Sequence, residues 1–204
     1  GLKVEDVDPN TIHRWGVGDR APDYKAPETE WGTMYAAYRP ADPGTYYYRF
    51  AHFLFPFITF TPNGSFEDQI ACTLNVPMDD THTMTYNVAW KQKTRPLETL
   101  ANGDWIPGLA PDMKFLPNTN DWYGRHRLVA RRENDYFIDR DMQKNVNYTG
   151  IQGIGRQDQA AVECMGEIVD RSLEHLAPSD RMIAITRKRL LTAAGLEKSF
   201  DGRR

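Results

Sequence analysis

The chain has too few cysteines, too few apolar residues in succession and too little net charge for several classes of protein. Its 204 residues include two cysteines, Cys72 and Cys164, which form no Cys-x-x-Cys pair. Two thiols cannot build a four-cysteine zinc site or an all-cysteine iron–sulfur cluster, and the low count favours a reducing cytoplasm over a secreted disulfide scaffold. No stretch approaches the ~20 apolar residues of a membrane helix. A net charge of -3 predicts no general affinity for nucleic acid or for an anionic membrane.

What the sequence does contain is typical of a soluble globular domain. Hydrophobic residues make up 40% and charged residues 26% of the chain, a balance that argues against disorder. The length predicts a single domain over residues 1–204. Strand-forming segments come first and helix-forming segments last, which predicts an α+β fold. In such a fold a long C-terminal helix packs across a curved antiparallel sheet.

The sheet is expected from an antiparallel meander over residues 31–91. Aromatic and β-branched residues alternate there with turn-forming clusters, and the expected strands are residues 31–39, 45–60, 68–76 and 82–91. The second of these is aromatic on both faces and is therefore expected to be central. Pro56 inside it predicts a bulge or bend, because proline cannot donate to the ladder. Residues 1–30, polar and dotted with proline, are expected to form an irregular arm.

Period-two alternation predicts which residues share a face of the third and fourth strands. Their apolar faces are Ile70, Cys72, Leu74 and Val76, and Met84, Tyr86, Val88 and Trp90. The opposite faces carry small polar residues, among them Asn75 and Asn87, which could hydrogen-bond a ligand if that face borders a cavity. His52 is a weaker candidate for substrate binding, because it shares a strand face with aromatic residues and buried histidines are more often satisfied by the core.

The rest of the chain is expected to hold long loops and then helices. Residues 92–147 read as loops with a short helix at 136–145, and residues 148–155 as a glycine loop that turns into a helix over 157–176. Gly166 is expected to kink that helix. Ser179 is expected to cap a last helix over 180–194, which ends at Gly195. Four arginines of the basic loop could meet a carboxylate or a neighbouring subunit, although a solvated loop is the commoner outcome: Arg125, Arg127, Arg131 and Arg132.

The spacing of residues along the sequence predicts no complete catalytic site. No two of the five histidines lie within two helical turns of each other, so no local two-histidine metal site is present. There is also no Gly-x-Ser-x-Gly nucleophile motif. Asp158 follows the glycine loop at the start of the expected helix. An acid there is usually a partner of the helix dipole, and a metal ligand is the alternative.

One long segment resembles a known family. Gly150-Ile-Gln-Gly-Ile-Gly-Arg-Gln-Asp-Gln-Ala-Ala-Val-Glu-Cys-Met-Gly-Glu-Ile-Val-Asp170-Arg-Ser-Leu-Glu-His-Leu is very similar to the C-terminal segment of Rieske non-haem iron oxygenases. It looks most like the branch of the phthalate 4,5-dioxygenase type. Val76-Pro-Met-Asp-Asp80 and Arg132-Glu-Asn-Asp-Tyr136 also resemble signatures of that branch. The resemblance covers about residues 30–195, and its specific part is 150–190.

The resemblance implies a helix-grip (START-like) fold with a substrate cavity, and an enzyme that hydroxylates or demethylates an aromatic acid with O2. It implies a mononuclear Fe(II) held by two histidines and one carboxylate, with Asp158 as the carboxylate. Electrons are then expected from a Rieske [2Fe–2S] cluster, normally in the neighbouring subunit of a homotrimer, which a reductase supplies. Such enzymes are cytoplasmic and need neither nucleic acid nor membrane.

Two features of that family are absent from this sequence. It has neither the Cys-x-His and Cys-x-x-His of a Rieske domain nor the closely spaced histidine pair that binds iron. Both lie N-terminal to the matched region in the family. The chain is therefore expected to be the C-terminal part of such a subunit, without a Rieske domain, and to be inactive and free of stoichiometric iron on its own. The alternative is a stand-alone helix-grip protein that binds a small molecule without redox chemistry.

Overall fold

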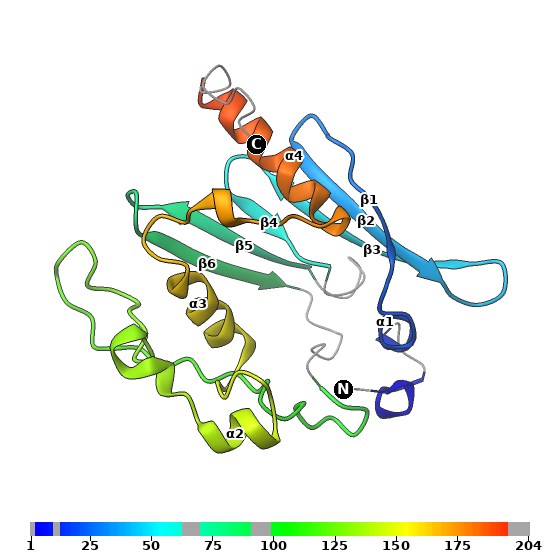
Figure 1. Cartoon of the computed structure of the whole chain (residues 1–204), viewed down its shortest axis with the longest axis horizontal. Coiled ribbons are helices and arrows are strands. Elements are labelled where there is room, and N and C mark those ends of the chain that lie inside the picture. The colour runs from blue at the N-terminus through cyan, green and yellow to red at the C-terminus, as the bar shows by residue number, and fades with distance from the viewer. Residues whose placement is uncertain (1–2, 10–12, 63–69, 91–98, 196–204) are drawn as a thin grey trace. The chain divides into compact units, whose positions relative to one another are not determined.

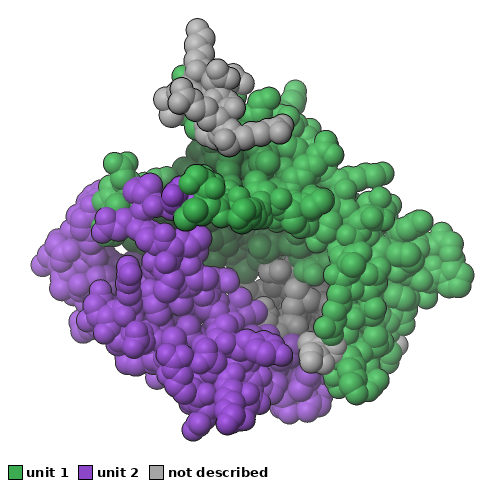
Figure 2. Space-filling view, in the orientation of Figure 1, with its two compact units in different colours: residues 1–97, 171–204 green, residues 98–170 purple. Residues whose placement is uncertain are grey.

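The computed structural model describes residues 3–9, 13–62, 70–90 and 99–195. The chain divides into two compact units, shown in different colours in Figure 2. The first comprises residues 1–97 and 171–204, and the second comprises residues 98–170. The first unit is therefore assembled from both ends of the sequence.

The first unit is built on a six-stranded antiparallel sheet whose strands follow one another in chain order (Figure 1). The strands are β1 (Asp23–Lys25), β2 (Gly32–Pro40), β3 (Tyr46–Leu54), β4 (Ile58–Phe60), β5 (Ile70–Pro77) and β6 (Thr83–Trp90). The predicted antiparallel meander is confirmed. Together with the C-terminal helix it confirms the α+β class.

One detail of the predicted meander and one of the predicted arm were wrong. The expected strand 45–60 is a hairpin of β3 and β4, because the chain reverses at the cis Phe55–Pro56 peptide and pairs His52 opposite Phe60. The bend predicted at Pro56 is therefore present, and it is a full reversal of the chain direction. The supposedly irregular arm also contains η1 (Val4–Asp6), α1 (His13–Gly18) and β1. Elements of three to six residues are too short to show a periodic pattern.

The strand register confirms the predicted faces of β5 and β6. Leu74 lies opposite Tyr86, and Thr73 lies opposite Asn87. Residues directly opposite in an antiparallel pair point to the same side of the sheet, so the register can be followed from β6 back to β2. One side, the aromatic face, carries large exposed rings: Tyr46, Tyr48, Phe50, Tyr86 and Trp90. The other side carries Thr33 and the small polar residues.

Helix α4 (Arg181–Ala193) packs on β2 through polar contacts. The Thr33 side chain, 1% exposed, shares a hydrogen bond of 2.5 Å with the Thr186 hydroxyl. Arg189 donates to the carbonyl oxygens of Thr29 and Gly32, and its guanidinium lies 4.8 Å from the centre of the Phe55 ring. The predicted packing of a C-terminal helix against the sheet is confirmed, and α4 lies on the side opposite the aromatic face.

The ends of the predicted helices need correction. Helix α3 (Ile154–Cys164) stops well before residue 176, because Gly166 adopts a φ of +90° that ends a helix instead of kinking it. Only short turns follow, η3 (Arg171–Leu173) and η4 (Pro178–Asp180). Ser179 lies inside η4 and does not cap α4, whose N-cap is Asp180. Gly195, with a φ of +71°, ends α4 as predicted.

An ion pair ties the segment after η3 to α4 and predicts a pH dependence. The Arg187 guanidinium donates to both oxygens of the Glu174 carboxylate, which holds the pKa of Glu174 below its usual 4.5. A lowered pKa stabilises the fold above the unfolded-state pKa, and this stabilisation disappears as the pH falls through the folded-state value. Urea unfolding of the chain should show Glu174→Gln to be destabilising at pH 7 and nearly neutral at a pH well below the folded-state pKa of Glu174. An equal difference at both pH values would contradict the assignment.

The second unit has little regular structure before residue 132. It contains η2 (Arg132–Phe137), α2 (Arg140–Asn145) and α3, and the predicted helix 136–145 is confirmed only for the α2 part. Residues 99–131 have no helix or strand among them, apart from two isolated bridges. A small core of Tyr136, Ile151 and Ala160 packs with Ile138. Among the helices of the described residues, none has the length and apolarity to cross a membrane.

Candidate functional site

The glycine loop fixes where α3 begins. Gly150 and Gly153 have φ values of +69° and +84°, a region that residues with a Cβ rarely adopt. A Cβ at Gly150 would also lie 2.5 Å from the carbonyl oxygen of Asp139. Gly153 is the N-cap of α3. The loop therefore brings the chain tightly into the helix, and Asp158 lies one turn further on.

Helix α3 has an inner side that packs within the second unit and an outer side that does not. Arg156 and Ala160 are buried on the inner side. The outer side is a stripe of residues three or four apart, Ile154, Asp158, Val162 and Met165, all of them exposed. Val162 and Met165 are 60% and 55% exposed. We refer to these four residues as the outer stripe.

Asp158 is a single carboxylate among apolar neighbours. Within the described part of the chain it has no hydrogen-bond or ion-pair partner. A carboxylate left without a partner beside apolar side chains is suited to bind a cation supplied with further ligands. The described residues include no group of three or more His, Cys, Asp or Glu side chains that could hold a metal. Asp158 has the chemistry of one possible metal ligand, and its role as an iron ligand stays a prediction.

The structure brings Asn75 and Asn87 together and separates them from His52. The Thr85 hydroxyl donates to Asn75 Oδ1 at 3.1 Å, and the Thr73 hydroxyl donates to Asn87 Oδ1 at 2.9 Å. The two amides are diagonal neighbours on the side of the sheet that α4 covers. His52 lies on the opposite, aromatic face, where burial lowers the pKa of its imidazole. One cavity bordering one face of the sheet could not include all three, and their roles in binding stay predictions.

The basic loop is solvated, as the commoner outcome predicts. The arginines at positions 125, 127, 131 and 132 are all exposed. Arg127 donates to the carbonyl oxygen of Pro117, and Arg131 forms a local ion pair with Glu133. These contacts are ordinary surface interactions.

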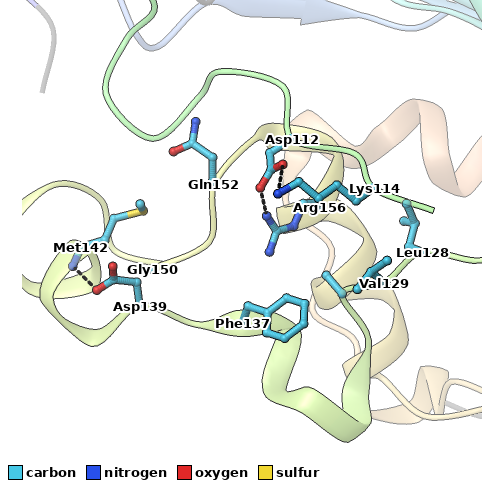
Figure 3. Close-up of a pocket in the computed structure, with 11 residues that line it drawn as sticks. Asp112, Lys114, Leu128, Val129, Phe137, Asp139, Met142, Gly150, Gln152 and Arg156 are labelled. Atoms are coloured by element: carbon cyan, nitrogen blue, oxygen red, sulfur yellow. Dashed lines mark hydrogen bonds and ion pairs between the residues drawn. The ribbon is translucent and has the colours of Figure 1, made fainter. Parts of the chain in front are cut away.

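A buried arginine that the sequence does not single out lies beside a cavity. Arg156 has a side chain 8% exposed and lies 2.6 Å from the Asp112 carboxylate, which also has Lys114 at 3.8 Å (Figure 3). Its other terminal nitrogen donates to the carbonyl oxygen of Tyr136 at 2.9 Å. A cavity of about 300 Å³ lies beside this group, with Leu128 and Phe137 among its walls. The one sequence signal was that Arg156 lies four residues before Ala160, on the same side of a helix.

Comparison with known proteins agrees with the resemblance noted in the sequence. Residues 7–201 match a family model described as LigXa C-terminal domain like. The chain is 47% identical over 177 residues to a 3-chlorobenzoate-3,4-dioxygenase oxygenase subunit of Comamonas testosteroni, covering 85% of this chain and 41% of that protein. It is 34% identical over 180 residues to a phthalate 4,5-dioxygenase oxygenase subunit of Pseudomonas putida, covering 86% and 38%. The chain thus spans about two fifths of the length of these relatives.

Proposed function

The chain belongs to the LigXa C-terminal-like domain family and is homologous to the C-terminal part of Rieske aromatic oxygenase alpha subunits, and from this premise we propose that it forms part of the catalytic domain of an oxygenase that hydroxylates or demethylates an aromatic acid with O2. Asp158 is the proposed carboxylate ligand of a mononuclear Fe(II). The two histidine ligands come from sequence outside this chain. The observation that carries the proposal is the unpartnered Asp158 carboxylate on the outer stripe of α3.

The chemistry of the donor set explains what Asp158 would do. A site of two histidines and one carboxylate would hold Fe(II) for activation of O2 with electrons from a Rieske [2Fe–2S] cluster. Asp158 would contribute the negatively charged oxygen ligand of that site. Val162 and Met165, one and two turns further along the same stripe, would exclude water and contact an apolar ring.

The first unit has a separate proposed role. We assign it the helix-grip (START-like) fold, in which the side of the sheet covered by α4 borders a ligand cavity. The support is the packing of α4 on the Thr33 side of β2. Asn75 and Asn87 share that side, and within the described residues only their amide oxygens are engaged, so their amide nitrogens could donate to the carboxylate of an acid substrate. His52, on the other face, is the weakest of the three candidates.

The complete enzyme is proposed to resemble its relatives in assembly. Sequence outside residues 1–204 would supply the Rieske cluster and the histidine ligands, a reductase would deliver electrons, and the subunits would associate as a cytoplasmic homotrimer. Each of these points rests on the family resemblance, because the chain spans only about two fifths of the length of its relatives.

The test is an assay of the complete oxygenase subunit that contains this chain, combined with a Rieske-system reductase and NADH. Benzoate, 3-chlorobenzoate and phthalate serve as probes. We expect O2 uptake that depends on one of the acids and is matched by a hydroxylated or demethylated product in mass spectrometry. If an acid binds but neither O2 uptake nor product follows, the oxygenase proposal fails, and the alternative of a non-redox helix-grip binder is supported.

A further inference from the structure

The corner that precedes α2 has an unusual backbone. Three consecutive residues without glycine's freedom, Asp135, Tyr136 and Phe137, have φ values of +49°, +52° and +53°. Side chains with a Cβ disfavour this left-handed region, and it persists only where surrounding contacts enforce it. Such corners concentrate at functional sites. The contacts that enforce this one therefore indicate what it is for.

Local bonds hold the corner, among them that of the Tyr136 N–H to the Arg131 carbonyl oxygen, and the contacts that reach beyond it lead from Tyr136 to α3. Tyr136 is 4% exposed, and its hydroxyl donates to Glu163 Oε2 at 2.7 Å. Its own carbonyl oxygen accepts from the Arg156 guanidinium at 2.9 Å. Arg156 and Glu163 are seven residues apart, which is two helical turns on the same side of α3. One residue of the corner thus holds the helix at both of its ends.

Further bonds keep the two attachment points in place. Arg156 is also paired with Asp112. Gln159, between the attachment points, donates to Glu163 Oε1 at 2.8 Å and to the Ala130 carbonyl oxygen at 3.1 Å. Burial and the neighbouring Glu163 carboxylate raise the pKa of the Tyr136 phenol far above its usual 10. The phenol therefore stays protonated at neutral pH, as its role as a donor to Glu163 requires.

Asp158 lies between the two attachment points but on the opposite side of the helix. A rotation of α3 about its axis, or a slide along it, would displace the Asp158 carboxylate directly. The two bonds that Tyr136 makes to α3 lie two helical turns apart, and together they resist both movements. We propose that Tyr136 is a positioning residue, which holds α3 through Arg156 and Glu163 so that Asp158 keeps the orientation needed to bind iron. This inference rests on the proposed function.

The test compares Tyr136→Phe with Tyr148→Phe in the complete oxygenase subunit. Both variants lose only a hydroxyl, but Tyr148 is 98% exposed and lies in the same unit. We expect Tyr136→Phe to retain its iron on purification, to lower kcat by about tenfold to a hundredfold and to leave the KM for the aromatic acid nearly unchanged. It should also release Fe(II) faster to a chelator and broaden the EPR spectrum of the nitric oxide adduct. Tyr148→Phe should match the wild type throughout.

A second pair of variants examines the other partner and remains informative if Tyr136→Phe does not fold. Glu163→Gln keeps an oxygen that accepts from the Tyr136 hydroxyl and loses only the bond from Gln159, so it should behave nearly as the wild type. Glu163→Ala should reproduce the Tyr136→Phe phenotype, and the double variant should be no worse than either single one. Unchanged iron release and an unchanged EPR spectrum in Tyr136→Phe or Glu163→Ala would overturn the positioning role, even with lower thermal stability. A wild-type subunit without iron or acid-dependent O2 uptake would instead defeat the proposed function.

Discussion

The complete oxygenase subunit carrying Asp158→Ala is expected to lose its mononuclear iron and to turn over at least about a hundredfold more slowly than the wild type. Loss of a residue that merely orients a metal ligand already lowers affinity or activity by about tenfold to a hundredfold, and loss of a ligand removes more. Asp158 has no partner within the described chain and points away from the small core of its unit. Its removal should therefore leave the fold of the second unit intact.

The measurement separates the two kinds of iron. Iron per subunit is determined by elemental analysis, while the visible absorption of the Rieske cluster is followed independently. Glu167→Ala is the matched control, because Glu167 is also an exposed acid of the same segment and should keep both iron and turnover. If Asp158→Ala retained full iron content and turnover, Asp158 would be no more than an acid near a helix end.

Gly32→Ala is expected to lower the free energy of unfolding of the 204-residue chain by about 3 kcal/mol or more. A Cβ at this position would lie 1.8 Å from the carbonyl oxygen of Phe53 and 2.9 Å from its carbonyl carbon. These are backbone atoms of the neighbouring strand β3, so the clash cannot be relieved by turning a side chain. The Gly32 carbonyl oxygen also accepts a hydrogen bond from Arg189 of α4, so a shift of β2 would disturb the packing of α4 on the sheet.

Urea unfolding followed by circular dichroism measures this effect, with Gly16→Ala as the matched control. A Cβ at Gly16, within α1, would meet the Arg39 guanidinium at 3.5 Å, which is ordinary contact. Alanine in place of a helical glycine reduces the freedom of the unfolded chain, and we expect no loss of stability there, or a gain of about 0.5 kcal/mol. Equal stability changes for the two substitutions would contradict the close approach of β2 and β3.

Alternation and local turn chemistry predicted the sheet well because both act over a few residues. The faces of β5 and β6 followed directly from the alternation of Leu74 with Asn75. The reversal at Pro56 was underestimated, since one proline marks a break without saying whether the strand resumes its direction. The ends of the helices were predicted least well. Gly166 was compatible with a kink or an end, and only its left-handed backbone decides for an end.

The sequence also predicted one part of the candidate site and not the other. The resemblance singled out Asp158 because a whole sequence segment matches the family. Nothing local to Tyr136 or Arg156 reveals their mutual contact across 20 residues or the salt bridge of Arg156 to Asp112 across 44. The three positive φ values at residues 135–137 were equally hidden. Asp, Tyr and Phe have no general preference for that region strong enough to predict it, and tertiary contacts impose it.

The division of the first unit between both ends of the sequence sets an order of events during synthesis on the ribosome. The bond between Thr33 and Thr186 joins residues 153 positions apart, so α4 cannot pack on the Thr33 side of the sheet until residues 181–193 have been made. The second unit consists of one continuous segment, residues 98–170, and can form as soon as that segment emerges. Its folding shortens the loop that α4 must close to reach β2, which reduces the entropy lost in that last step.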